Sequence, residues 1–332
     1  MSVLFRNCLI AGVSAVICAG AATTASAQSL SLRLSSENPP GGNTVHILNR
    51  FAEHLEESLG DDVEIEIFDS GVLGNEEVHL QQIRTGQIDV HSTGSDAIQL
   101  DPKWAIFDMP FLFANRDVVA EILDGEIGEE MAASMREAAG IEVLGYGEIG
   151  FRQMTNNIRP INVPEDMDGM RIRIPGSETR ALMLETFGAV PVDINFGELY
   201  LALQQNTVDG QENPLISIDA GSFQEVQEYL SITNHVYTPI TLTMNGETYD
   251  NLTDEQRTAV EEAARAAVEW TRQNGADADD RLITAFEEEM EINQADIPAF
   301  REASQPVYDS VAELAGADFV ERLLAAVEAA GE

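Results

Sequence analysis

Cysteine, lysine and positive charge are all scarce in this sequence, and each scarcity narrows the possible functions. Of 332 residues, 18 are lysine or arginine and 58 are aspartate or glutamate, which gives a formal net charge of −40. Proteins that contact nucleic-acid phosphates need a positive surface, so nucleic acid is not an expected partner. Lys103 is the only lysine. Such acidity fits a saline habitat, where counterions screen self-repulsion, and equally an ordinary acidic soluble protein.

The two cysteines lie close to the N-terminus. Cys8 and Cys18 both fall within the first 27 residues. If this segment is removed on export, the mature chain has no thiol for a disulfide, a metal ion or nucleophilic catalysis.

The first 27 residues have the pattern of a secretory signal peptide. A basic residue precedes an apolar run over residues 8–22, and the small residues Ala25, Ser26 and Ala27 follow. The run is interrupted by glycine, serine and threonine and is shorter than the ~20 residues that span a bilayer. The bulky Ile17 disfavours a lipid anchor on the next residue. We expect a signal peptide over residues 1–27, cleavage near Ala27 and a periplasmic mature protein.

Predicted strands and helices alternate along the mature chain. Strands are expected at 29–35, 63–68 and 88–92, with helices at 45–59 and 76–85 between them. Since this β-α-β-α-β order is typical of a parallel sheet with helices on its faces, it predicts an α/β unit. A second unit follows, with strands at 141–144, 170–174 and 208–211 and helices at 178–187 and 197–205.

The last third of the chain is predicted to be mostly helical. Thr253 and Gln256 have the spacing of a capping box and would open a helix that ends near residue 291. Residues 309–330 are also helix-like. Because no low-complexity linker separates the two α/β units, we expect two lobes that move about a hinge.

Several short motifs resemble functional sites only in part. The glycines of GYGEIG (145–150) match G-x-G-x-x-G, but the residues that follow are poor helix formers, so we interpret the run as a crossing between lobes. DMDG (166–169) lacks the remaining calcium ligands and predicts a turn. Among the five histidines no metal-ligand spacing occurs, and only His235 falls near a predicted crossing. No metal and no cofactor are expected.

Three arginines gather at residues 171–180 despite the overall acidity. By the two-residue period of a strand, Arg171 and Arg173 share the face opposite the apolar residues. Pro175 then ends the strand, and Ser177 is placed to cap a helix. Arg173 would thus lie where open α/β sheets bind ligands, and its guanidinium could hold a carboxylate through two bonds. Both arginines could instead be paired with acidic residues at the surface.

The chain resembles the solute-binding proteins of tripartite ATP-independent periplasmic (TRAP) transporters. The residues that carry the resemblance are GFRQMTN (150–156), MRIRIP (170–175), FGELYLALQ (196–204) and above all NTVDGQENP (206–214), with further matches at 71–74, 109–113 and 233–235. They cover nearly the whole mature chain in order, and DGQENP (209–214) is highly specific.

The resemblance implies a nonenzymatic receptor with a ligand cleft between two α/β lobes. Lobe I would comprise residues 28–149 and 239–278, and lobe II residues 150–238 and 279–332. Arg173 would clamp the ligand carboxylate, Asn213 would hydrogen-bond near it, and Phe196 would pack against the ligand. The ligand-binding residues implied in all are Arg173, Arg152, Asn213, Phe196, Glu37, Thr93, Ser95 and Glu76.

Three positions depart from family members of known specificity. Glu37 stands where sialic-acid binders carry an amide, Gly94 where they carry a glutamate, and Arg171 where ectoine binders carry a tryptophan. A carboxylate beside a bound anion is repulsive unless it accepts hydrogen bonds, so Glu37 favours a hydroxylated ligand such as a sugar acid.

The expected function is therefore delivery of a small organic acid to integral-membrane TRAP subunits by a monomeric protein. A C4-dicarboxylate or a 2-oxo acid is the alternative ligand, and an exported lyase or glycosidase with paired carboxylates is the alternative class.

Overall fold

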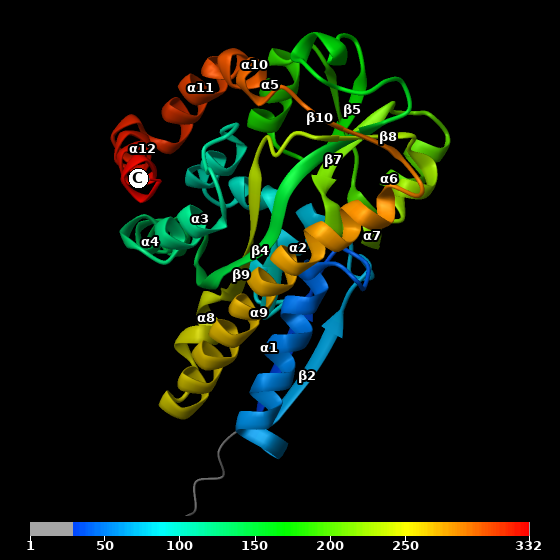
Figure 1. The fold of residues 1–332 in the computed structure, drawn as a ribbon. Coiled ribbons are helices and arrows are strands. Elements are labelled where there is room, and N and C mark those ends of the chain that lie inside the picture. Colours follow the sequence, from blue (N-terminus) through cyan, green and yellow to red (C-terminus); the bar gives the residue numbers. More distant parts are fainter. Residues whose placement is uncertain (1–28, 332) are drawn as a thin grey trace, which may run out of the picture.

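Ten strands form one mixed sheet in the computed structural model, which describes residues 29–331 (Figure 1). The main strand order is β2-β1-β3-β9-β4-β7-β5-β6, and β8 and β10 join it at β4. The predicted signal peptide over residues 1–27 lies outside the described residues. The two expected α/β lobes lie at opposite ends of this sheet.

Lobe I contains the first predicted α/β unit. The parallel strands are β1 (Leu30–Ser35), β2 (Val63–Phe68) and β3 (Val90–Thr93), and the helices are α1 (Asn43–Leu59) and α2 (Glu76–Arg84). Their bounds agree with the predicted ones to within two residues, because the apolar periods of this region also match the burial of its residues. Leu32, Leu34, Ile47, Leu48 and Phe51 are buried in the core between the sheet and α1.

The strand predicted at 141–144 is much longer, and the sheet is not wholly parallel. Strand β4 (Ile141–Asn156) pairs antiparallel with β9 (Tyr237–Asn245), which pairs antiparallel with β3. Farther along, β4 pairs with β7 (Gly210–Pro214) and β8 (Tyr229–Ile232) in lobe II. The glycine run 145–150 is therefore part of a strand that crosses between the lobes. Because glycine is rare in strands, residue propensities did not predict that the strand continues through this run.

Close packing explains two of these glycines. A Cβ atom on Gly147 would lie 2.7 Å from Thr271 Oγ1 and 2.8 Å from Ile47 Cδ1, and one on Gly145 would lie 2.9 Å from Val268 Cγ2. The backbone of β4 thus approaches α9 and α1 more closely than a side chain allows.

Lobe II contains the second unit. Strand β5 (Arg171–Ile174) pairs in parallel with β7 and with β6 (Val190–Asp193), which the sequence analysis missed. The helices α5 (Glu178–Thr186) and α6 (Phe196–Gln204) lie within a residue of the predicted ones. Helix α7 (Leu215–Ala220) follows β7, and β10 (Glu291–Gln294) pairs with β8.

One long helix runs alongside both lobes. Helix α9 (Asp254–Phe286) begins at the predicted capping box, where Gln256 N donates to Thr253 Oγ1 and Thr253 N donates to the Gln256 side chain. It ends five residues before the predicted position, because the chain then turns into β10. Figure 1 shows α9 extending from beside α1 to the level of α7. The predicted lobe boundaries fall inside β4, β9 and α9 and stay a prediction.

The C-terminal helices close one side of the molecule. The helix predicted over 309–330 is two helices, α11 (Gln305–Ala315) and α12 (Ala317–Ala330), separated by Gly316 at φ +97°. With α10 (Ile297–Ala303), they pack beside α3 (Arg116–Leu123), α4 (Glu126–Ala139) and α5 (Figure 1). The remaining α-helix of the described residues is the short α8 (Gly246–Asp250), which follows β9.

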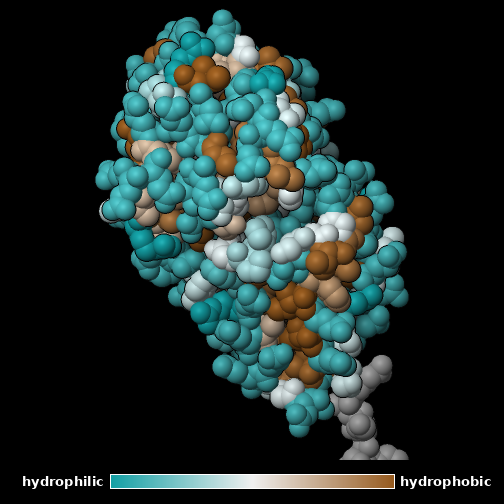
Figure 2. All heavy atoms as spheres, turned by 90° about the vertical axis from the view of Figure 1, so that its right-hand side faces the viewer, coloured by the Kyte–Doolittle hydropathy of each residue, from teal (hydrophilic) through white to brown (hydrophobic). Residues whose placement is uncertain are grey.

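The surface agrees with the acidic composition. Figure 2 shows a face that is mostly hydrophilic, with hydrophobic atoms gathered mainly on its lower part. Within residues 29–331, no helix has both the length and the apolar content that crossing a membrane requires.

Candidate ligand-binding site

The two arginines of β5 have different surroundings. Arg171 is exposed, and its Nη2 donates to Asp209 Oδ1 at 2.6 Å. Arg173 is 3% exposed and comes directly before the end of the strand. Ser177 then caps α5, since its Oγ accepts from Arg180 N at 3.3 Å. The surface pairing considered for both arginines thus applies only to Arg171.

Arg173 is a buried cation with unused hydrogen-bonding capacity. Its Nε donates to the carbonyl oxygen of Ile194 at 2.7 Å, and its guanidinium lies 5.9 Å from the ring centroid of Phe196. In residues 29–331 its two terminal nitrogens make no hydrogen bond or ion pair within normal distance. Burial, together with the nearby charge of Arg152, lowers the pKa of Arg173 to about 10. An anion between the lobes would relieve this destabilisation.

Arg152 is held by an acidic partner. It forms an ion pair with Glu212, to which Nε and Nη2 both donate, and Nη2 also donates to Asn213 Oδ1 at 3.0 Å. Arg180 Nη1 donates to both Glu212 carboxylate oxygens at 3.0 Å, and His235 Nε2 lies 3.2 Å from Oε2. Burial alone would raise the pKa of Glu212, but the two arginines lower it well below its usual range. Arg152 therefore supports the site mainly as one member of a rigid buried network.

Arg180 extends this network to Asp108. Its Nε donates to Asp108 Oδ1 at 2.8 Å, and the other Asp108 oxygen accepts from Ser177 Oγ at 2.5 Å. The helix cap after β5 is thereby tied to Asp108, which precedes the MPFLF segment. Neither Arg180, Asp108 nor Glu212 was singled out from the sequence, because no local pattern distinguishes a buried ion pair from a surface one.

Seven of the eight predicted residues line one cavity of about 50 Å³ between the lobes. Glu37, Glu76 and Ser95 come from lobe I, whereas Arg173, Phe196 and Asn213 come from lobe II and Arg152 from the crossing strand. The exception is Thr93, which is buried in the sheet with its hydroxyl 3.3 Å from Thr243 Oγ1. Residues lining the same cavity that the sequence analysis did not name as binding residues are Asn38, Thr44, Gly94, Asp96, Ile149, Pro175 and Ser217.

Two acidic side chains of this cavity reach from lobe I to backbone groups of lobe II. Burial and the nearby Glu76 carboxylate raise the pKa of Glu37 to about 7, although a hydrogen bond from the Phe196 backbone opposes the shift. The same two causes raise the pKa of Asp96 to about 7, and Asp96 accepts from the Gly176 backbone. Asp96 directly follows Ser95, so its position after a predicted strand was the signal that could have identified it.

Further polar contacts cross the cleft. Asn75 Nδ2 donates to Asn195 Oδ1 at 3.4 Å, and Gln99 Nε2 donates to the Gly176 carbonyl oxygen at 3.3 Å. These contacts hold the lobes together around the cavity. The cavity is far smaller than the roughly 300 to 1,000 Å³ of drug-sized pockets, which agrees with a small ligand.

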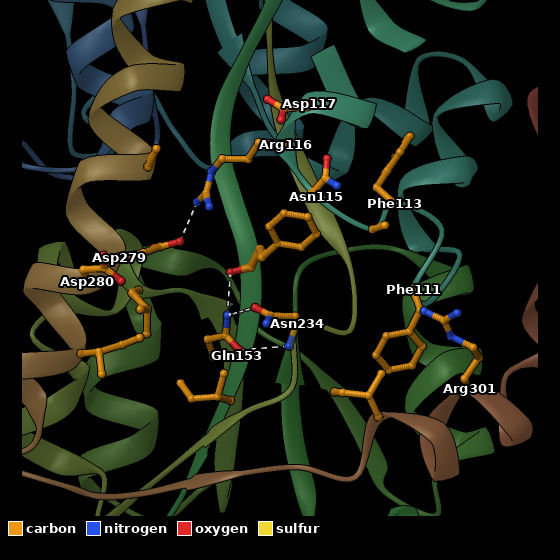
Figure 3. Close-up of a pocket in the computed structure, with 17 residues that line it drawn as sticks. Phe111, Phe113, Asn115, Arg116, Asp117, Gln153, Asn234, Asp279, Asp280 and Arg301 are labelled. Carbon is orange, nitrogen blue, oxygen red and sulfur yellow. Dashed lines mark hydrogen bonds and ion pairs between the residues drawn. The ribbon is translucent and has the colours of Figure 1, made fainter. Parts of the chain in front are cut away.

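A larger pocket of about 680 Å³ lies on the other side of β4 and contains none of the predicted residues. Figure 3 shows that it is lined by Phe111, Arg116, Gln153, Asn234 and Asp279, among others, so β4, α9 and the segment between β8 and β9 all border it. Phe151 and Gln153 face this pocket whereas Arg152 faces the cavity, as strand alternation requires.

The chain is similar to known solute-binding proteins over most of its length. The model of the bacterial extracellular solute-binding protein family 7 matches residues 34–314. The 2,3-diketo-L-gulonate-binding periplasmic protein YiaO of Escherichia coli (strain K12) is 31% identical over 267 residues, which are 80% of this chain and 81% of that protein.

Two solved structures are similar over nearly the whole chain. The sugar acid binding protein DctPAm from Advenella mimigardefordensis, in complex with galactonate, has a TM-score of 0.87 at 27% identity and covers 91% of this chain and 99% of its own. A TRAP periplasmic solute binding protein from Polaromonas sp. JS666, bound to D-erythronate, has a TM-score of 0.84 at 30% identity, with 89% and 98% covered. The chain belongs to family 7 of the bacterial extracellular solute-binding proteins.

Proposed function

We propose that this protein is a periplasmic receptor that binds a small hydroxylated carboxylate, most simply a sugar acid, and delivers it chemically unchanged to TRAP membrane subunits. The observation that carries the proposal is Arg173, a buried guanidinium whose two terminal nitrogens are uncommitted within the described residues. A carboxylate would accept from both nitrogens in a charge-assisted pair. The aromatic ring of Phe196 would cover an apolar face of the ligand.

The other side of the cavity favours hydroxyl groups on the ligand. Glu37, Glu76 and Asp96 are hydrogen-bond acceptors when ionised and could accept from several hydroxyls. Galactonate and D-erythronate, the ligands of the two similar structures, combine one carboxylate with several hydroxyls. A C4-dicarboxylate would place its second negative charge against these acidic residues, so it is the less suitable ligand.

Binding is coupled to closure because the cavity is formed by both lobes. A ligand that contacts Arg173 in lobe II and Glu37 in lobe I interacts fully only with the closed form, and so it shifts the population toward that form. The membrane subunits would then recognise the closed lobes. Export with cleavage near Ala27 would place the receptor beside them.

Isothermal titration calorimetry with galactonate, D-erythronate and succinate tests this function. The receptor should bind a sugar acid without altering it, as NMR of the recovered ligand would show. Arg173→Met should lose about 2–5 kcal/mol of binding free energy, roughly 30- to 4,000-fold in affinity, because the carboxylate loses its buried partner.

Arg171→Met is the matched control, since Arg171 lies on the same strand but pairs with Asp209 at the surface. Its affinity should equal that of the wild type. Equal affinities in the wild type and Arg173→Met would contradict the carboxylate clamp, and turnover of the sugar acid would indicate an enzyme instead.

A further inference from the structure

A second cluster of polar side chains lies in the wall of the ligand cavity. Glu76 and His79 are three residues apart on α2 and so share one helix face, and His91 lies on β3, against which α2 packs. One potential ligand atom from each of the three residues lies within 4.8 Å of the others. The Glu-x-x-His spacing is also used by metal sites in helical bundles, but the histidines alone do not reveal it.

Both ring nitrogens of His91 have polar partners. Nδ1 lies 2.8 Å from the carbonyl oxygen of Ser35, which accepts, and 2.9 Å from Ser35 Oγ, which can donate or accept. Nε2 lies 2.9 Å from Glu76 Oε1. With the hydrogen on Nδ1, the Nε2 lone pair of a neutral ring faces a carboxylate oxygen. In that tautomer a cation, either a proton or a metal ion, would lie between these two atoms.

The imidazole ring of His79 is buried without a hydrogen-bond partner among the described residues. The side chain is 0% exposed, and neither ring nitrogen has a hydrogen-bond partner within the part of the chain that the structure describes. Its ring meets the His91 ring edge-on, with centroids 5.2 Å apart. A buried polar group without a partner is unfavourable, and a metal ion shared with His91 and Glu76 would remove that cost.

We propose that Glu76, His79 and His91 bind one divalent transition-metal ion, for which Zn²⁺ is the best match. Two imidazoles and a carboxylate are a donor set that Zn²⁺ accepts with a fourth position left open. The Ser35 carbonyl holds the other nitrogen of His91, as backbone carbonyls do around metal-bound histidines.

The position of the site links it to the cavity. Glu76 lines the cavity together with Glu37 and Asp96, so the cavity contains three carboxyl groups. Of the two arginines that line it, Arg152 is paired with Glu212, and Arg173 has no ion pair in the described residues. A divalent cation at Glu76 offsets part of this negative charge. The metal ion therefore lowers the electrostatic repulsion between the cavity and a bound organic anion. Because the metal ligands are protein side chains, the same metal site would serve whichever organic acid the receptor carries.

Zinc titration of the mature protein tests the site. After removal of metals with a chelator, ZnCl₂ is titrated in competition with a chromophoric chelator, in the presence of NaCl and excess MgCl₂ to suppress binding to surface carboxylates. One equivalent of Zn²⁺ should bind. Co²⁺ in its place should give visible absorption typical of a four-coordinate nitrogen and oxygen site.

Variants separate this cluster from adventitious surface binding. His79→Leu should weaken Zn²⁺ binding at least about 100-fold, since loss of a direct ligand exceeds the 10- to 100-fold cost of losing an outer partner. His54→Gln, a change at an exposed histidine of α1, should leave it unchanged. Glu76→Gln provides a second variant, and circular dichroism confirms that each protein is folded.

Absence of stoichiometric Zn²⁺ binding in the wild type would overturn the proposal and leave a proton between His91 and Glu76. Binding that survives both His79→Leu and Glu76→Gln, or that His54→Gln removes, would also overturn it, because the ion would then lie elsewhere.

Discussion

At the residue scale, Glu37 and Asp96 make ligand affinity dependent on pH. Both carboxyl groups have a pKa of about 7, raised by burial and by the Glu76 charge. A bound organic anion adds negative charge and raises both values further, so the complex takes up protons. Affinity for a sugar acid should therefore fall as pH rises through about 7. Calorimetry in buffers with different ionisation enthalpies measures both the affinity and the proton uptake.

Glu37→Gln is the variant that isolates this effect. Its affinity should depend less on pH than that of the wild type, because one titrating group is gone. Tighter binding at higher pH in the wild type would contradict the predicted proton uptake.

Glu212 affects the stability of the fold, and its pKa is shifted downward, opposite to the pKa values of Glu37 and Asp96. Its carboxylate is 0% exposed between Arg152 and Arg180, which hold its pKa well below the ordinary 4.5. The stabilisation is present above pH 4.5 and is lost as pH falls below that value, because the unfolded chain then binds the proton first. Glu212→Gln leaves Arg152 without its carboxylate partner, whereas Arg180 keeps Asp108, and it should cost about 3–5 kcal/mol at neutral pH.

Urea unfolding of Glu212→Gln against pH measures this cost, and the difference from the wild type should shrink below pH 4.5. Glu53→Gln removes an exposed ion pair with Arg50 and should cost only about 0–1 kcal/mol. Equal effects of the two substitutions would mean that the buried network does not stabilise the fold.

At the scale of elements, the packing of β4 against α9 requires glycine at position 147. Gly147→Ala should destabilise the protein by about 1–3 kcal/mol, since the added methyl would meet Thr271 and Ile47 below 3 Å. Gly197→Ala in α6 has no atom within 4 Å of the new Cβ and should gain about 0.4–1 kcal/mol. Denaturant midpoints of the two variants should move in opposite directions. A Gly147→Ala midpoint equal to or above that of the wild type would contradict the close packing of β4.

At the scale of the whole molecule, the net charge of −40 opposes folding through self-repulsion. Salt screens these charges, with a Debye length that falls from about 30 Å at 0.01 M to about 3 Å at 1 M. The midpoint of thermal unfolding should therefore rise between these NaCl concentrations. Sucrose at matched osmolality is the control, and a midpoint that rises equally in sucrose would show that charge screening is not the cause.

Much of the local structure follows from short-range patterns in the chain. The apolar periods of α1, β2, α5 and α6 and the capping box of α9 depend on neighbouring residues, so their positions could be predicted from neighbours alone. The arginine at the end of β5 could be recognised for the same reason. The long β4, the break at Gly316 and the antiparallel β9 could not, because they depend on the pairing of β4 with β9, whose partners are at least 86 residues apart (Phe151 and Tyr237), or on one glycine conformation.

The resemblance singled out Arg173, and the tertiary structure supplies the physical reason why it differs from Arg171, since the surroundings of each arginine come from distant segments. Asp209 neutralises Arg171 at the surface, while Ile194 and Phe196 hold Arg173 in the cavity. Likewise, the chain reveals that acidic residues are abundant, but only folding selects Glu212 to pair with two buried arginines. Short-range periodicity determines secondary structure, whereas burial and charge pairing at long range decide which side chains remain available to a ligand.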